Sequence, residues 1–137
     1  MWNERMYNMK IMADENIPFV KQAFSEFGEV VTASGREITH DMVKDAAILL
    51  VRSVTRVDEK LLGGTKIKFV GSATTGIDHI DTVYLVQNNI GFTCAPGSNA
   101  EAVAEYVIAG LLFLAQKRHL DLEKCMIGII GAGNVGS

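Results

Sequence analysis

Two strand-like segments in this chain, residues 47–51 and 67–71, are each followed by residues that can bind a small anion. These candidate substrate-binding residues are Arg52, Ser53, Thr74, Thr75 and Gly76. They offer hydroxyl groups, backbone N–H groups and one guanidinium, and the glycine lets a ligand approach the main chain closely. If both segments are strands of one parallel sheet, their carboxyl ends meet at one edge. The pattern therefore predicts a site for a carboxylate or a phosphate at that edge.

Each of these side chains also has a purely structural interpretation. The hydroxyls of Ser53 and Thr74 could satisfy backbone groups of their own loops, which is the commoner role of a single loop serine or threonine. Arg52 could instead form a surface ion pair with Asp14 or Glu15, which follow a neighbouring predicted strand. We expect the two hydroxyls to bind a ligand because they lie at adjacent strand ends, and we leave both interpretations of Arg52 open.

A glycine-rich loop lies at the end of the sequence. The apolar residues 126–130 lead directly into the GxGxxG spacing of a dinucleotide-binding loop. In such a loop the first glycine makes a tight turn, the second admits the pyrophosphate, and the third lets a helix pack on the strand. The predicted cofactor-binding residues are Gly131, Gly133, Asn134, Val135 and Gly136. The helix that follows such a loop, and the acidic residue that binds the ribose, would lie beyond Ser137.

The remaining ionisable residues do not form a recognisable catalytic or metal-binding group. His40, His79 and His119 have neither metal-ligand spacing nor an evident carboxylate partner, so we expect each to have a structural or surface role. Arg36 follows a Ser-Gly turn and is expected to be solvated. We therefore predict no catalytic residue and no metal site in this chain.

Short β-rich runs alternate with helical patterns from Lys10 onward, which is typical of a parallel sheet with helical crossovers. The expected strands are residues 11–13, 30–33, 47–51, 67–71 and 90–93. The expected helices are residues 19–27 with Gly28 as C-cap, 39–46, 58–62, 81–89 with Val83, Leu85 and Val86 as its apolar face, and a long helix from Asn99. Right-handed crossovers then predict an α/β fold with a flavodoxin-like, doubly wound sheet in the order 2-1-3-4-5.

The sequence is expected to divide into four segments. These are a disordered extension over residues 1–8, a substrate-side α/β domain over 9–98, an interdomain helix and connection over 99–123, and the start of a Rossmann domain over 124–137. The helix capped by Asn99 is apolar on nearly every side, as in a helix buried on most faces. We expect it to mediate a homodimer, because a large apolar surface normally becomes an interface.

Composition limits the function further. The chain has 137 residues, of which 48% are hydrophobic, enough for one domain with a core. Thirteen Lys and Arg against 16 Asp and Glu give a net charge of −3, which favours neither nucleic acid nor an anionic membrane as a partner. The long apolar helix is too short and too charged to span a bilayer. Cys94 and Cys125 form no disulfide framework, which favours a reducing, cytoplasmic setting.

Several segments carry a family resemblance. They are Asp14-Glu-Asn16, Val51-Arg-Ser-Val-Thr55, Phe69-Val-Gly-Ser-Ala-Thr-Thr-Gly-Ile-Asp-His79, Cys94-Ala-Pro-Gly-Ser-Asn99 and the glycine loop. With the helix after Asn99, this arrangement resembles the D-2-hydroxyacid dehydrogenases. Within that family, the sequences of the first four segments are most similar to the 4-phosphoerythronate dehydrogenases. The resemblance covers the first part of such an enzyme, up to the cofactor loop.

The resemblance implies NAD-dependent oxidation of 4-phospho-D-erythronate to its 2-oxo acid in pyridoxal 5′-phosphate biosynthesis. It implies that Ser53 and Thr74 contact the substrate, that the amides near Thr75 and Gly76 cradle its carboxylate, and that the catalytic His, Arg and Glu lie beyond Ser137. On that pattern the chain alone would be inactive and would bind NAD no better than about millimolar. Two alternatives remain: another D-2-hydroxyacid dehydrogenase, such as one for 3-phosphoglycerate, and a non-catalytic, receiver-like binding module.

Overall fold

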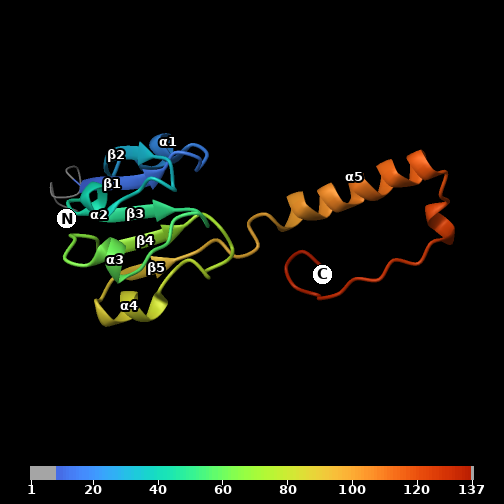
Figure 1. Ribbon diagram of the computed structural model, residues 1–137. Helices are drawn as coiled ribbons and strands as arrows, with labels where there is room; N and C mark the ends of the chain where they lie inside the picture. Colours follow the sequence, from blue (N-terminus) through green and yellow to red (C-terminus); the bar gives the residue numbers. More distant parts are fainter. Residues whose placement is uncertain (1–8, 137) are drawn as a thin grey trace. The chain divides into compact units, whose positions relative to one another are not determined.

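Five parallel strands form a single sheet in the computed structural model, which describes residues 9–136 (Figure 1). The strands are β1 (Met9–Asp14), β2 (Gly28–Ala33), β3 (Ile48–Val51), β4 (Phe69–Ser72) and β5 (Gly91–Thr93). Their order in the sheet is β2-β1-β3-β4-β5, and every neighbouring pair is parallel. The α/β class and the strand order expected from the sequence are therefore confirmed. The extension predicted over residues 1–8 lies outside the described residues.

Short helices connect the strands, and one long helix follows the sheet. The helices are α1 (Val20–Phe24), α2 (His40–Val43), α3 (Glu59–Leu62), α4 (Thr82–Gln87) and α5 (Ala100–Arg118), followed by the 3₁₀ helix η1 (Leu122–Lys124). Two aspartates fix helix starts. The Asp58 carboxylate accepts from the Leu61 amide at 3.2 Å, and the Asp81 carboxylate accepts from the Tyr84 amide at 2.9 Å. Each bond satisfies a backbone donor that a helix start leaves unpaired.

Side chains alternate across each strand, so the sheet builds a core on both of its faces. The larger core combines strand residues with α2, α3 and α4 and includes Met12, Val43, Leu49, Val51, Leu61, Leu62, Val70 and Leu85. The smaller core lies on the face that α1 covers and consists of Ile11, Ala13, Val20 and Leu50. Helices therefore pack on both faces, as a doubly wound sheet requires.

Two expectations about the helices are wrong in detail. The helix expected over residues 19–27 is only the five-residue α1, and Gly28 begins β2 instead of capping that helix. Gly28 pairs with Met9, and a side chain at Gly28 would overlap the Met9 carbonyl oxygen, so the close strand pairing requires a glycine. On α4, Val83 and Val86 are 64% and 76% exposed, so most of its expected apolar face lies outside the core.

The described chain divides into two compact units between Ala95 and Pro96. The second unit contains α5 and η1, and residues 126–130 behind them do not form the expected first strand of a Rossmann domain. A strand is stabilised by hydrogen bonds to a neighbouring strand, and no other described segment pairs with this one. The sequence-based boundary after residue 98 stays a prediction.

The 19-residue helix α5 exposes most of its apolar side chains. Asn99 occupies its N-cap position, but the Asn99 side chain makes no capping hydrogen bond. Tyr106 and Phe113 are 81% and 63% exposed, and Ala115 alone among the residues of α5 is buried. The burial expected for this helix is therefore not provided by the described residues. None of the helices in the described part of the chain combines the length and hydropathy needed to cross a bilayer.

Candidate active-site crevice

Backbone hydrogen bonds join the loops that follow β3 and β4. The Val57 amide donates to the His79 carbonyl at 2.8 Å, and the Asp81 amide donates to the Val57 carbonyl at 2.8 Å. These bonds form an isolated parallel bridge between Val57 and Ile80. The two loops are therefore held against each other at the carboxyl edge of the sheet, where open α/β sheets bind their ligands.

The two loops border an open cavity of about 380 Å³, which we call the crevice site. Its lining residues are Ser53, Val54, Arg56, Gly76, Asp78 and His79. The structure thus places Ser53 and Gly76, both singled out from the sequence, in one cavity. The sequence pattern does not predict Arg56 and Asp78 as site residues, and it predicts a structural or surface role for His79, because the placement of all three depends on the bridge between the loops.

A chain of hydrogen bonds connects Thr74 to the crevice site. Thr74 Oγ1 lies 3.0 Å from Ser72 Oγ, and Ser72 Oγ lies 3.3 Å from His79 Nε2. Ser72 is only 4% exposed, so its hydroxyl depends on these protein partners. Thr74 does not line the crevice site itself. Thr75 Oγ1 donates to the Ala95 carbonyl at 3.3 Å and so ties the loop after β4 to the end of β5. Direct contact of either threonine with a ligand stays a prediction.

His79 brings a hydrogen-bonding ring to the crevice site. Partial burial lowers the pKa of His79 below its ordinary value of 6.5, and the neighbouring Asp78 carboxylate opposes that shift. The neutral ring is therefore favoured near neutral pH. A neutral imidazole has one N–H group and one acceptor nitrogen, so Nε2 donates to Ser72 or accepts from it according to the tautomer.

Arg52 lies half-buried at the end of β3. It forms no ion pair with Asp14 or Glu15 within residues 9–136. Asp14 is instead fully buried, and its Oδ1 accepts from the backbone and side-chain nitrogens of Asn16 at 2.9 and 3.2 Å. The interpretation of Arg52 as a surface ion-pair residue is therefore wrong, and its contact with a ligand stays a prediction.

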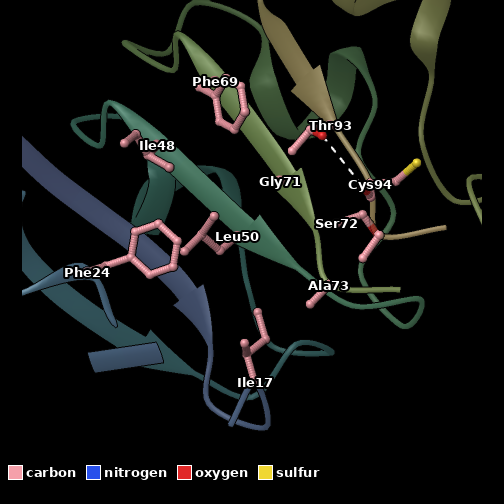
Figure 2. Close-up of a pocket in the computed structure, with 11 residues that line it drawn as sticks. Ile17, Phe24, Ile48, Leu50, Phe69, Gly71, Ser72, Ala73, Thr93 and Cys94 are labelled. Atoms are coloured by element: carbon pink, nitrogen blue, oxygen red, sulfur yellow. Dashed lines mark hydrogen bonds between the residues drawn. The ribbon is translucent and has the colours of Figure 1, made fainter. Parts of the chain in front are cut away.

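A second hollow, of about 280 Å³, lies on the sheet face that carries α1 (Figure 2). Its lining residues are Ile17, Phe24, Ile48, Leu50, Phe69, Gly71, Ser72, Ala73, Thr93, Cys94 and Ala95. Figure 2 shows Phe24, Leu50 and Phe69 gathered around it, from α1 and from two strands. Because these walls are mainly hydrocarbon, the hollow lacks the convergent polar groups that orient a charged acid. The crevice site is therefore the better candidate for that chemistry.

The predicted cofactor-binding residues lie together in one loop of the second unit. Gly131 has a φ of 94°, and a side chain at Gly136 would collide with the Gly131 carbonyl oxygen, so both positions require glycine. A side chain at Gly133 would meet no atom within 4 Å, which leaves that backbone open to a ligand. This tight turn with an open backbone fits a pyrophosphate. Within the described residues, no three His, Cys, Asp or Glu side chains are placed to hold a metal ion.

Comparison with known proteins places the chain in a class of dehydrogenases whose fold contains a doubly wound sheet of this kind. The model of the D-isomer specific 2-hydroxyacid dehydrogenase catalytic domain matches residues 6–132. The chain is 53% identical over 130 residues to the erythronate-4-phosphate dehydrogenase of Shewanella halifaxensis, covering 94% of this chain and 35% of that protein. It is 54% identical over 129 residues to the corresponding protein of Marinobacter nauticus, covering 93% and 34%. The chain therefore spans about a third of the length of these curated relatives.

Solved structures agree with the fold. The NAD⁺-bound 3-phosphoglycerate dehydrogenase of Entamoeba histolytica is 29% identical with a TM-score of 0.68, over 94% of this chain and 48% of that one. The apo D-lactate dehydrogenase of Escherichia coli matches with a TM-score of 0.70 at 17% identity, over 93% and 49%, and supports the fold alone. This chain belongs to the D-isomer specific 2-hydroxyacid dehydrogenase family.

Proposed function

We propose that this chain forms the substrate-binding side of an NAD-dependent enzyme that oxidises 4-phospho-D-erythronate to its 2-oxo acid, within pyridoxal 5′-phosphate biosynthesis. The observation that carries the proposal is the crevice site, where Ser53 and Gly76 meet at the carboxyl edge of a doubly wound sheet. The high identity to erythronate-4-phosphate dehydrogenases along 94% of this chain supports the choice of substrate. The NAD⁺ bound by the Entamoeba histolytica relative supports the choice of cofactor.

In this proposal the crevice site binds and orients the hydroxy acid. The Ser53 hydroxyl and the Gly76 amide can each donate to a substrate carboxylate, and Arg52, at the end of the same strand as Ser53, supplies positive charge beside them. A neutral His79 can hydrogen-bond the substrate hydroxyl. Ser72 holds both the His79 ring and the Thr74 hydroxyl, at 3.3 and 3.0 Å, and so keeps this wall in one arrangement.

The glycine loop would hold the pyrophosphate of NAD through its open backbone, with Asn134 and Val135 between the second and third glycines. When bound, NAD supplies the hydride acceptor of the reaction. The described residues offer no group that we assign as the catalytic base, so we expect the chain alone to show no turnover. Its affinity for NAD is expected to be no better than about millimolar, because we assign none of the described residues as the anchor of the ribose.

The test is a spectrophotometric assay for NADH with a longer protein that carries this chain and a complete cofactor domain. With 4-phospho-D-erythronate, Ser53→Ala and Thr74→Ala should each lower kcat/KM by the equivalent of about 1–3 kcal/mol, since each removes a hydrogen bond at a charged ligand or its support. The exposed Ser25, whose hydroxyl bonds only the Gln22 carbonyl, provides the matched control as Ser25→Ala. Unchanged kinetics for both site variants would remove the crevice site from the reaction.

A second candidate substrate is 3-phosphoglycerate, which the relationship to the Entamoeba histolytica enzyme favours. A panel of D-2-hydroxy acids decides between the two, because the preferred substrate is the one with the highest kcat/KM. The alternative of a receiver-like signalling module has less support, because Arg52 and Ser53 follow β3 where that class requires an aspartate. Family membership also argues against it.

We also propose a homodimer formed through α5, supported by the exposed apolar side chains of that helix. We further propose that the protein resides in the cytoplasm. Cys94 and Cys125 are both free thiols in the structure, which fits a reducing compartment.

A further inference from the structure

A third cavity, of about 580 Å³, opens beside the crevice site, and we call it the basic pocket. Its lining residues are Gly35, Arg36, Ile38, Thr39, His40, Val54, Thr55, Arg56, Asp58, Lys60 and Leu61. They belong to the loops after β2 and β3 and to the starts of α2 and α3. The two cavities share Val54 and Arg56, so the basic pocket adjoins the crevice site along the carboxyl edge of the sheet.

Positive charge dominates the wall of the basic pocket. Arg36, Arg56 and Lys60 line it, against the single carboxylate of Asp58. Asp58 contacts Arg56 Nε at 3.0 Å, whereas neither Arg36 nor Lys60 forms an ion pair within residues 9–136. Exposed cationic side chains are ordinarily solvated one by one, far from each other. Here they converge on one cavity of a chain whose net charge is −3, and that arrangement favours an anion as the occupant.

The donors around the basic pocket suit a phosphate. The bond from Arg56 to Asp58 uses only Nε, and the other guanidinium N–H groups remain available for an oxyanion. His40 is held at the rim by a 2.9 Å hydrogen bond between Nε2 and the Gly63 carbonyl. Arginine binds phosphate oxygens in pairs, and a phosphate monoester presents three acceptor oxygens with up to two negative charges.

The floor of the basic pocket is fixed by buried contacts. The Thr55 hydroxyl donates to the Gly35 carbonyl at 2.7 Å, which joins the two loops that carry Arg36 and Arg56. Ile38 and Leu61, which line the cavity, are both buried. A site whose frame is already ordered loses less conformational entropy when a ligand binds.

We propose that the basic pocket holds the phosphoryl group of a phosphorylated hydroxy acid whose carboxylate end occupies the crevice site. Arg36 and Lys60 bind only the phosphoryl end, and Arg56 lies between the two ends. This assignment rests on the proposed function for its phosphorylated substrate. It adds the residues that make the enzyme prefer a phosphorylated acid over the same acid without phosphate.

The test compares three ligands by NMR titration of the ¹⁵N-labelled chain: 4-phospho-D-erythronate, D-erythronate and inorganic phosphate. The phosphorylated acid and inorganic phosphate should shift the amides around Arg36 and Lys60, and D-erythronate should not. Arg36→Gln and Lys60→Gln should each weaken binding of the phosphorylated acid about tenfold, as expected when a charged hydrogen bond is lost. Lys68→Gln is the control, since Lys68 is exposed just before β4, at the opposite edge of the sheet, and should change nothing.

Inorganic phosphate should also compete with the phosphorylated acid. Simultaneous binding of both, or equal binding of the phosphorylated acid by the parent chain and both variants, would overturn the proposal. The proposed function fails separately: a longer protein that prefers a different phosphorylated acid in the NADH assay, with the same loss in Arg36→Gln, would overturn the named substrate and support the pocket.

Discussion

Thr55 and Gly35 join the loops after β3 and β2, because the Thr55 hydroxyl donates to the Gly35 carbonyl oxygen at 2.7 Å. Thr55 is only 3% exposed, so water does not compete for this bond. Both residues line the basic pocket. The bond therefore sets the position of one wall of that pocket against the other.

Thr55→Val keeps the shape of the side chain and removes its donor. We expect a loss of about 1–3 kcal/mol in the free energy of unfolding, because the buried Gly35 carbonyl is left without its partner. Urea denaturation followed by circular dichroism measures it. Thr93→Val is the control, since the Thr93 hydroxyl is exposed and bonds only the adjacent Cys94 carbonyl at 3.4 Å, and its effect should stay within about 0.5 kcal/mol. Equal losses in both variants would contradict this role of Thr55.

Gly35→Ala introduces a methyl group where there is no room for one. An added Cβ would lie 2.9 Å from Asp14 Cγ and 2.9 Å from Val54 Cγ2, so the buried Asp14 carboxylate or its loop must move. We expect destabilisation of about 1–3 kcal/mol from this overpacking. Gly110→Ala should have the opposite effect, because nothing lies within 4 Å of a Cβ in the middle of α5 and alanine favours a helix by about 1 kcal/mol. Thermal unfolding and helical circular dichroism distinguish the two results.

Acidification should reveal the burial of His79. Its pKa is lowered in the folded chain, so the folded state takes up fewer protons than the unfolded state as the pH falls below about 6.5. The contribution of neutral His79 to stability is complete above that pH and is lost as the pH falls through the folded pKa. Denaturation series at pH 7.5 and pH 5.5 measure the free energy of unfolding at each pH. Between these two values His79→Gln should therefore lose less of that free energy than the parent chain loses. Equal losses of unfolding free energy in the two proteins would argue against a lowered pKa of His79.

Self-association through α5 is directly measurable. Leu112 and Phe113 are 57% and 63% exposed, and burying them against a second copy would remove that apolar area from water. We expect a dimer in analytical ultracentrifugation at tens of micromolar, and Leu112→Asp should dissociate it because burial of an unpaired carboxylate is unfavourable. Gln116→Glu places the same charge on an exposed polar position of α5 and should leave the dimer intact. A monodisperse monomer with α5 ordered would refute the dimer.

The sheet was predictable because its strands are signalled by continuous apolar runs. Leu49 and Val51 on β3, and Val70 on β4, are fully buried, as a central parallel strand requires. The helices were less predictable, since local periodicity does not reveal how much of a helix the sheet covers. Residues 126–130 have the composition of a strand and form none, because pairing is a tertiary property that composition does not record.

Only those residues of the site that closely follow a predicted strand could be predicted from the sequence. Ser53 and Gly76 follow adjacent strands, and a parallel sheet brings such positions together. Arg56 lies beyond the strand end, and its position depends on the bridge between Val57 and Ile80. Arg36 is exposed, as the sequence predicts, and only the fold reveals that its turn faces α3 across a cavity.

The position of β1 also has a consequence for synthesis of the chain. β1 leaves the ribosome before the other strands, yet it lies between β2 and β3, and Ile11 pairs with Val30 on one side and Ile48 on the other. Because such distant pairings must await later segments, β1 stays without its inner neighbour until β3 has been made. During that interval its apolar residues 11–13 are available to chaperones and to other nascent chains, so β1 needs protection from aggregation until β3 has been made.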